Sequence, residues 1–407
     1  MRRDVLNEAL REVPIPVPGD AEERGLRVVE AAYAEREPRE RTAPESRLPS
    51  LPRLALALAL ATLLAALLLS PAGADVRDWV DDAFTSSAPR PEPTLSEIPG
   101  GGRLLVQSAE GPWVVQPDGS RRLLGDYEEA DWSPHGLFAA VAKGRTLSAV
   151  EPDGTPHWSF TAPARVADPR WSPVPGERIA FRSGRALHVI AGDGTGDRVL
   201  AAKTAPVAPA WSPYGDSSLA YVSAAGALRI ISSESAEKLA AAPALPDVAE
   251  IEWGAGGSAI LEASPRAMRL RPVRIQKLRP GPELGQARML AVAPGADLVD
   301  AALAPRRQMV AAVLTRWQDH GTRSSVVVYG PSPGQRRRLL TVPGSLGEVA
   351  WSPDGLRLLV AWPYANQWLF LPVDRGQGRA VANVSDAFAP GGRAASFPRV
   401  EGWCCPR

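Results

Sequence analysis

The chain has 407 residues, of which 45% are hydrophobic and 22% are charged, and this balance excludes wholesale disorder. The formal net charge is only +1, so no global electrostatic field would attract nucleic acid or an acidic surface. With 41 Pro and 36 Gly, the sequence favours many turns and few long helices.

The first 50 residues form a short, charged segment with two amphipathic stretches. In "RDVLNEALREV" the apolar residues fall on one helical stripe, "PIPVPG" interrupts it, and "DAEERGLRVVEAAYAERE" resumes the pattern, with Asp20 and Glu23 spaced as a capping box. Two such helices bury too little apolar surface to fold unaided. Two interpretations stay open, namely a partly ordered tail and a docking element for a cytosolic protein.

The strongest single feature is the apolar run "LALALALATLLAALLL" at 54–69. The uncharged stretch is 21 residues long, between Arg53 and Asp75, and at about 1.5 Å per residue it spans a hydrocarbon core of about 30 Å. We therefore predict a transmembrane helix over 51–74. Arg residues precede it and Asp residues follow it, with Trp79 placed where an interfacial aromatic would lie, so the positive-inside rule predicts a cytoplasmic N-terminus and an extracytoplasmic remainder.

An alternative for this region is a cleaved signal peptide, because "AGA" at 72–74 resembles an A-x-A cleavage site. A signal peptide rarely carries about 50 residues before its apolar core. The uncleaved anchor is therefore the preferred interpretation, and it predicts a single-pass protein of the cell membrane. Residues 75–102 then form an extracytoplasmic linker, whose Pro-rich part "SSAPRPEPTLSEIPGGG" would be extended and hold the next domain off the membrane.

From residue 103 to residue 407 the chain repeats. Trp132, Trp171, Trp211 and Trp253 are separated by 39, 40 and 42 residues, and the next marker, Trp351, follows after 98 residues, which is two steps. The missing copy is "DAALAPRRQMVAAVL" at 300–314, with Leu303 in the Trp position. All-β units of about 40 residues are typical of the four-stranded blades of a propeller.

Each unit follows one plan. A strand ends at the Trp, Ser-Pro-x-Gly forms a turn, an alternating strand such as "RIAFRS" follows, and a polar turn such as "EPDGT" separates the last two strands. We interpret the Trp as a residue that packs one blade against the next. The alternative is that these indoles line a carbohydrate or peptide cleft.

The two ends of the repeat region complement each other. Residues 103–124 carry the later strands of a unit without its Trp strand, whereas "PRVEGWCCPR" at 398–407 has a Trp strand, ending at Trp403, with nothing after it. Together they would make one blade and close the ring, which removes exposed sheet edges. The expected fold is an all-β, seven-bladed propeller; six blades are the alternative, because 253–350 is degenerate.

The repeat "WSPDG", followed by a strand and a "DG" turn, resembles the TolB-type, WD40-like bacterial β-propeller repeat over about 300 of the 407 residues. The resemblance implies a propeller that binds proteins or peptides. The same repeat also forms the propeller of prolyl-oligopeptidase-like enzymes. The chain departs from both groups. We expect a membrane anchor where TolB has an N-terminal domain, and we expect no α/β-hydrolase domain after the propeller.

The sequence offers little catalytic chemistry. It contains no H-E-x-x-H or P-loop motif, and "AGDGTGDR" at 191–198 is a blade turn because it opens no helix. We expect no catalytic residues, no metal and no cofactor. The alternative is a propeller lyase or hydrolase with His residues and a metal in the central channel. The four His fall in different blades, namely His135, His157, His188 and His320.

Two further features invite an interpretation. The basic stretch "RLRPVRIQKLRPG" is either a solvated strand pair or an anion-binding patch at the rim, made of Arg269, Arg271, Arg274, Lys277 and Arg279. The adjacent Cys404 and Cys405 are expected to be unpaired thiols, because a bridge between neighbours would be strained.

These observations favour a membrane-anchored, extracytoplasmic propeller that is not an enzyme. It would bind a protein, a peptide or an envelope component outside the cell and no nucleic acid. The short cytosolic segment, single span and outer sensor match the layout of bitopic anti-sigma factors, so residues 1–50 would contact a cytosolic protein.

Overall fold

The computed structural model describes residues 89, 91–92, 95–173, 178–214, 216–254, 257–275, 281–318, 321–389 and 396–405. All of them belong to one compact unit, Asp75–Arg407. The predicted cytoplasmic segment 1–50, the predicted transmembrane helix 51–74 and the linker up to residue 88 lie outside the described residues. Among the described residues, no helix combines the length and apolar character that a membrane span requires.

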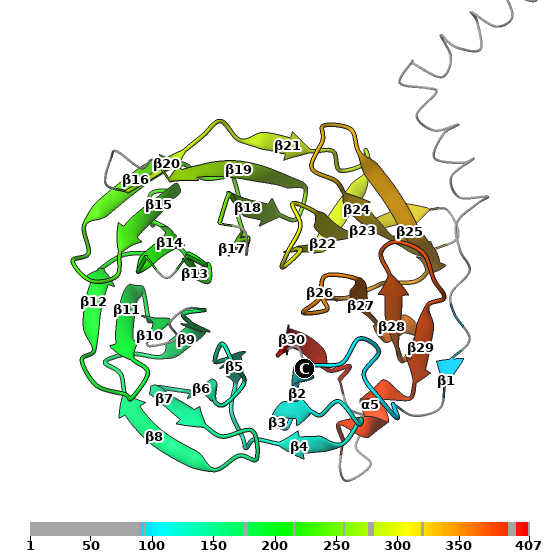
Figure 1. Ribbon diagram of the computed structural model, residues 1–407, viewed down its shortest axis with the longest axis horizontal. Coiled ribbons are helices and arrows are strands. Elements are labelled where there is room, and N and C mark those ends of the chain that lie inside the picture. Colours follow the sequence, from blue (N-terminus) through cyan, green and yellow to red (C-terminus); the bar gives the residue numbers. More distant parts are fainter. Residues whose placement is uncertain are drawn as a thin grey trace, which may run out of the picture. The chain divides into compact units, whose positions relative to one another are not determined.

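The strands form seven sheets arranged around a central channel, each with its first strand innermost (Figure 1). Each sheet is one blade, and the strands that short turns join in sequence run antiparallel. Blades 1 to 3 follow the chain in order. Their strands are β5 (Glu129–Trp132), β6 (Ala139–Lys143), β7 (Thr146–Val150), β8 (Pro156–Thr161), β9 (Val166–Trp171), β10 (Arg178–Ser183), β11 (Ala186–Ala191), β12 (Arg198–Ala201), β13 (Ala210–Trp211), β14 (Ser218–Val222), β15 (Ala227–Ser232) and β16 (Lys238–Pro243).

Blades 4 to 6 continue around the ring, and blades 4 and 6 each carry an additional strand. Their elements are β17 (Glu250–Trp253), β18 (Ala259–Ser264), β19 (Ala267–Ile275), β20 (Pro282–Leu284), β21 (Arg288–Leu290), β22 (Ala296–Leu303), β23 (Val310–Gln318), β24 (Gly321–Tyr329), β25 (Arg336–Pro343), β26 (Val349–Trp351), β27 (Arg357–Trp362), the 3₁₀ helix η1 (Pro363–Ala365), β28 (Gln367–Pro372), β29 (Arg379–Ala382) and the short helix α5 (Val384–Ala387). The extra strand of blade 4 is β21, which pairs with β19.

Blade 7 is built from both parts of the chain that flank the other six blades. Its innermost strand is β30 (Arg399–Cys404), which pairs with β2 (Arg103–Ser108) so that Trp403 lies opposite Leu104, and β3 (Gly111–Val115) and β4 (Arg121–Leu123) complete the sheet. The predicted seven-bladed, all-β propeller with a composite closing blade is therefore confirmed, and the six-bladed alternative is wrong.

The hydrophobic core is divided among the seams between blades. Seven clusters of buried residues occur, and each contains one marker residue, namely one of the six Trp or Leu303. The cluster around Trp211, for example, joins Leu187 and Val189 of blade 2 to Leu219 and Ile231 of blade 3. The six indoles are only 6–9% exposed. Each marker thus lies between two sheets and gives apolar contact to both.

Some indoles also bridge the seam with a hydrogen bond. Trp211 Nε1 donates to the carbonyl oxygen of Arg170 over 2.8 Å, and Trp351 Nε1 donates to that of Ala302 over 2.9 Å. In both cases the acceptor directly precedes the marker of the preceding blade. Each of these bonds joins the innermost strands of two neighbouring blades.

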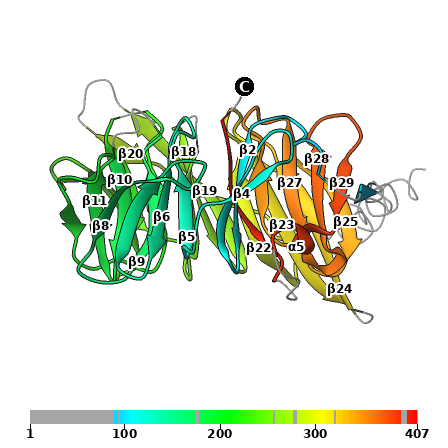
Figure 2. The ribbon, with the colours of Figure 1, turned by 90° about the horizontal axis from the view of Figure 1, so that it is seen from below.

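A serine follows four of the six marker Trp residues and holds the following turn together. Ser352 is fully buried, and its hydroxyl accepts a hydrogen bond from the backbone N–H of Arg357 at the start of the next strand, over 2.9 Å. Gly355 in the same turn has φ +72°, a conformation that L-residues with a side chain rarely adopt. Since all innermost strands run in the same direction, these turns lie on one side of the propeller, which we call the Ser-Pro face (Figure 2).

The structure differs from the prediction at the end of the linker. Residues Pro91–Glu92 form β1, which pairs in parallel with β29, and Ile98 is buried. Arg379 fixes this arrangement, because its guanidinium contacts both carboxylate oxygens of Glu92 at 2.7 and 2.5 Å and Glu97 at 3.1 Å. The linker was predicted to be extended as far as residue 102, whereas its last part packs onto blades 6 and 7.

The seam packing makes a direct prediction about stability. Replacement of Trp351 by Ala should lower the free energy of unfolding by about 3–5 kcal/mol, because it leaves a cavity between blades 5 and 6. Trp317 is 75% exposed at the end of β23, so Trp317→Ala is the matched control and should change the stability by less than about 0.5 kcal/mol. Urea titration of both variants measures the difference, and equal losses would contradict this role of the marker residues.

Candidate functional site

The central channel is lined by charged side chains from the innermost strands. In β17 the sequence is Glu250-Ile251-Glu252-Trp253, and the two carboxylates alternate with the two buried apolar residues. Because side chains of a strand alternate between its two faces, Ile251 and Trp253 pack into the seam while Glu250 and Glu252 point into the channel. The strand β5 repeats this pattern with Glu129 and Asp131.

An acidic residue lies three positions before the marker in five of the seven blades. These residues are Glu129, Asp168, Glu250, Asp300 and Glu348. In blade 7 the acid is Glu401, which lies where β30 shifts its register against β2. Blade 3 has Ala208 at this position. The acidic lining is therefore a property of the repeat and not of one strand.

Several of these carboxylates connect neighbouring blades through the backbone. The carboxylate of Asp131 accepts a hydrogen bond from the N–H of Trp171 over 2.6 Å, and that of Glu252 accepts one from the N–H of Leu303 over 2.6 Å. Asp300 accepts one from the N–H of Val349 over 2.7 Å. These N–H groups lie on the unpaired edges of innermost strands, so the carboxylates satisfy donors that no sheet partner reaches.

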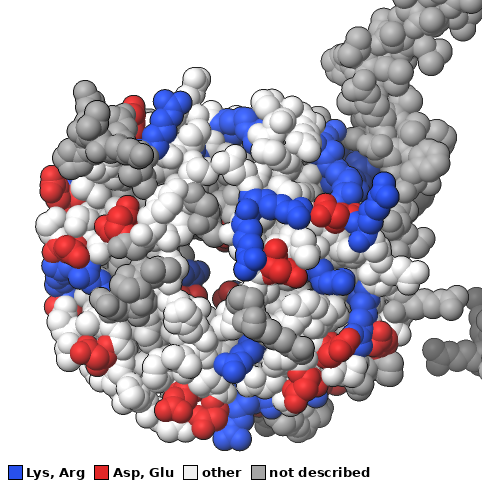
Figure 3. Space-filling view, viewed as in Figure 1, with Lys and Arg blue, Asp and Glu red and all other residues white. Residues whose placement is uncertain are grey.

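The channel forms a cavity of about 490 Å³ on the Ser-Pro side, and charged atoms are visible deep inside its central opening (Figure 3). Its charged lining consists of Arg170, Glu250, Glu252, Asp300, Glu348 and Glu401. Five carboxyl groups thus face one guanidinium. In the part of the chain that the structure describes, no group of three or more His, Cys, Asp or Glu is arranged to hold a metal ion.

Burial shifts the protonation of the channel carboxyls. Desolvation, reinforced by the neighbouring Glu252, raises the pKa of Glu250 to about 7. Desolvation likewise raises the pKa of Glu252 to about 7, and it raises the pKa of Asp300, which Glu250 raises further. Glu250 and Asp300 are hydrogen-bonded to each other, which requires a shared proton. Blades 4 and 5 therefore hold protons near neutral pH that exposed carboxylates would release.

Among the described residues that line this cavity, Arg170 is the only basic one. Burial opposes its charge, but Asp131, Asp168, Glu401 and Glu250 outweigh that effect and raise the pKa of Arg170. Its Nη1 donates to the carbonyl oxygen of Pro169 over 2.9 Å. Asp168 is itself paired with Arg182 at 2.5 Å, so it is already neutralised within blade 2. Glu401 is also paired, with Arg399 at 2.8 Å. Among the described residues that line the cavity, carboxyl groups still outnumber cations.

Exposed apolar residues lie in three of the Ser-Pro turns. Leu137 is 63% exposed, Tyr214 is 53% exposed and Leu356 is 45% exposed, and each follows a marker Trp by three to five residues. The prolines of these turns, among them Pro213 and Pro353, line the channel cavity itself. An apolar rim around a charged centre is the layout of many protein-binding surfaces.

The predicted anion-binding patch is not assembled as one free surface. Arg269 and Arg271 both contact the carboxylate of the fully buried Glu262, at 2.7 and 2.9 Å, and both donate to the carbonyl oxygen of Pro243. They neutralise a buried charge at the seam between blades 3 and 4. Arg274 is exposed, whereas Lys277 and Arg279 lie outside the described residues. Anion binding at this rim stays a prediction.

None of the three described His residues lines the channel cavity. His135 and His157 are exposed and line a groove between blades 1 and 2, and His188 is buried within blade 2, where its Nδ1 lies 2.9 Å from Asp197 Oδ1. His320 lies outside the described residues. His135, His157 and His188 therefore do not form the alternative His site in the channel, while the predicted absence of enzymatic activity stays untested.

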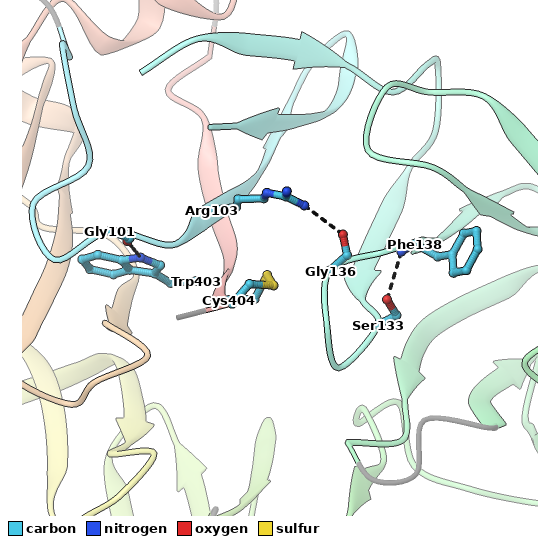
Figure 4. Close-up of a disulfide and its surroundings, with 8 residues drawn as sticks. Gly101, Arg103, Ser133, Gly136, Phe138, Trp403 and Cys404 are labelled. Carbon is cyan, nitrogen blue, oxygen red and sulfur yellow. Dashed lines mark hydrogen bonds between the residues drawn. A yellow bond between two sulfur atoms is a disulfide. The ribbon is translucent and has the colours of Figure 1, made fainter. Parts of the chain in front are cut away.

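The expectation of free C-terminal thiols is wrong, because Cys404 and Cys405 are joined by a disulfide (Figure 4). Cys405 has φ +65°, and this backbone turn brings the second sulfur back to the first. The bridge packs against Gly136 in the first Ser-Pro turn, where a Cβ would lie 2.4 Å from Cys405 Sγ. Arg103 Nη1 donates to the carbonyl oxygen of Gly136 over 3.0 Å, and Trp403 Nε1 donates to that of Gly101 over 2.8 Å.

Sequence comparison identifies no family for the chain, since no family model and no curated protein matches it. Its fold is similar to the β-propeller domain of Cps50 (Swd1) from Myceliophteria thermophila, with 15% identity and a TM-score of 0.51, over 65% of this chain and 94% of that domain. It is also similar to KlHsv2 with loop 6CD replaced by a Gly-Ser linker, with 13% identity and a TM-score of 0.50, over 69% and 93% of the two chains. At these identities the likeness shows the β-propeller fold alone.

The acidic channel predicts how stability depends on pH. The pKa values of Glu250 and Glu252 are raised from 4.5 to about 7, so the folded chain holds protons that the unfolded chain releases. The stabilisation is complete below about pH 4.5 and is lost as the pH rises through about 7, and each group contributes about 3 kcal/mol. We therefore expect a lower Tm at pH 8 than at pH 5.5.

A variant separates this effect from other titrations. Glu252→Gln still accepts the hydrogen bond from Leu303, but it removes a buried charge, so it should raise the Tm at pH 8 and leave it nearly unchanged at pH 5.5. Glu110→Gln, in the exposed turn after β2, is the control and should change neither value. A Tm that rises from pH 5.5 to pH 8 would contradict the account.

Proposed function

We propose that the propeller is a binding module that captures a protein or peptide on its Ser-Pro face and takes a Lys or Arg side chain of this partner into the central channel. The observation that carries the proposal is the surplus of carboxyl groups around Arg170 within an apolar rim. A second cation in the channel would replace the shared proton between Glu250 and Asp300 and form charge-assisted hydrogen bonds. The apolar rim would contribute contact area around this anchor.

The proposal includes the membrane topology of the binding module. The run at 54–69 supports a single transmembrane helix, and the Arg residues before it support a cytoplasmic N-terminus with the propeller outside. The resemblance of the repeats to TolB-type propellers agrees with an envelope protein, a peptide or another envelope component as the ligand. The amphipathic stretches of residues 1–50 would then contact a cytosolic protein and signal to it.

The binding half is tested with a peptide whose charge can be removed without a change of shape. Fluorescein-labelled Ala-Leu-Arg-Leu-Ala should bind the full-length protein at least about tenfold more tightly than the same peptide with neutral citrulline in place of Arg, as measured by fluorescence anisotropy. Affinity for the Arg peptide should rise from pH 5.5 to pH 8, because the cation binds the deprotonated carboxyls.

A double variant locates this binding in the channel. Glu348→Gln combined with Glu401→Gln should reduce the affinity for the Arg peptide to that for the citrulline peptide. The exposed pair Glu234→Gln and Glu237→Gln, in the turn between β15 and β16, is the matched control and should leave binding unchanged. Equal affinities for the two peptides, or equal effects of the two double variants, would contradict binding of the cationic side chain in the channel.

The topology half is tested by proteolysis of intact cells. With an epitope tag before Met1, external protease should degrade the propeller and leave a tagged fragment of less than about 100 residues, because the bilayer protects the cytoplasmic segment and the span. Complete protection of the full chain in intact cells, with cleavage only after lysis, would place the propeller inside and contradict the proposed topology.

A further inference from the structure

The seam between blades 4 and 5 differs from the others because its marker is Leu303 instead of Trp. A groove of about 570 Å³ opens at this seam, next to the Ser-Pro turns. Its apolar wall includes Leu270, Pro272 and Leu303, with Pro331 at one end. Leucine is smaller than tryptophan, so it leaves room that an indole occupies in the neighbouring seams.

Three arginines line this apolar groove, namely Arg288, Arg306 and Arg307. Arg288 and Arg306 form no ion pair with any other residue in the described part of the chain. Arg307 contacts Asp374 at 3.1 Å, but both side chains are largely exposed, so this pair is weak. The groove therefore matches a segment that combines carboxylates with a large apolar side chain.

The position of Asp374 connects this groove to the N-terminal end of the described chain. Asp374 lies in the turn between β28 and β29, and the same turn contains Gly378, where a Cβ would lie 3.3 Å from Pro89. Arg337 donates to the carbonyl oxygen of Asp374 over 3.3 Å. Basic side chains thus extend from beside the central opening toward the edge where β1 lies (Figure 3). The turn between β28 and β29 therefore contacts Arg307 through Asp374 and lies next to Pro89 through Gly378.

The segment that directly precedes Pro89 has the complementary chemistry. Residues 75–88 read "DVRDWVDDAFTSSA", with four Asp and one Arg, and therefore carry a net charge of −3. Trp79 lies between Asp78 and the pair Asp81 and Asp82. Fourteen residues in extended form reach about 46 Å, which exceeds the span of a six-residue turn by more than twofold.

We propose that residues 75–88 dock into the groove between blades 4 and 5 of the same chain. Trp79 takes the place that the indole of the marker residue fills in other seams, and Asp78, Asp81 and Asp82 face the three arginines. Trp79 then has a protein site and not the membrane interface that the sequence suggested. This docking does not depend on the proposed cationic ligand.

Photo-crosslinking of the full-length protein tests this docking. With Trp79→p-benzoylphenylalanine, irradiation should attach residue 79 to residues 257–272 or 303–309 of the same chain, as mapped by mass spectrometry after digestion. Crosslinks that map to other blades would overturn the proposal. A product with the mass of a dimer would also overturn it, because the groove would then hold the segment of a second copy.

Variants separate docking from misfolding. Asp78→Asn, Asp81→Asn and Asp82→Asn together leave the propeller untouched and should lower the crosslink yield by about tenfold, since they remove three ion pairs. Leu303→Trp should fill the groove and abolish the crosslink without a loss of thermal stability.

Arg306→Glu should lower the crosslink yield, whereas Arg185→Glu is the control and should not. Arg185 is an exposed arginine in the turn between β10 and β11. An unchanged yield in the triple Asn variant would contradict the proposal.

Discussion

The whole ring depends on the contact that one large apolar side chain makes with two neighbouring sheets. No single blade can bury both of its faces, so a four-stranded sheet of this size is unstable alone. The marker Trp or Leu303 sits at the end of each innermost strand and joins the apolar residues of adjacent blades into one cluster per seam. The closing blade follows from the same need, because β30 brings Trp403 to the last open seam. Leu303 shows the reverse case, since a smaller marker leaves a groove.

This way of closing the ring also produces the charged channel. Innermost strands leave an unpaired edge of backbone N–H groups, and the carboxylates of Asp131, Glu252 and Asp300 accept hydrogen bonds from them. The blades are thereby connected at the axis, but carboxyl groups accumulate in a confined cavity around Arg170. Desolvation raises their pKa values, and Glu250 and Asp300 share a proton. A structural device of the repeat therefore creates a site that would favour a cation from outside.

Much of the fold could be predicted from the spacing of Trp and Ser-Pro-x-Gly, because these residues fix where a strand ends and where it turns. The site was harder to predict. Glu250 and Glu252 are ordinary residues within one strand, and only their alternation with Ile251 and Trp253, repeated in other units, indicates a common face. Arg269 and Arg271 resembled a free basic patch because Glu262 comes from the neighbouring strand. The disulfide depends on the left-handed backbone of Cys405, which the sequence does not reveal.

The central claim is that the marker tryptophans lie sealed between blades, and hydrogen exchange of their indole N–H groups tests it most directly. In the full-length protein labelled with 15N-tryptophan, the indole protons of Trp211, Trp351 and Trp403 should exchange with solvent slowly, at rates set by opening of the seams, because each is buried and hydrogen-bonded. The indole proton of Trp317, which is 75% exposed, should exchange rapidly in the same sample. Rapid exchange of the three marker indoles, at a rate similar to that of Trp317, would contradict a ring built on sealed seams.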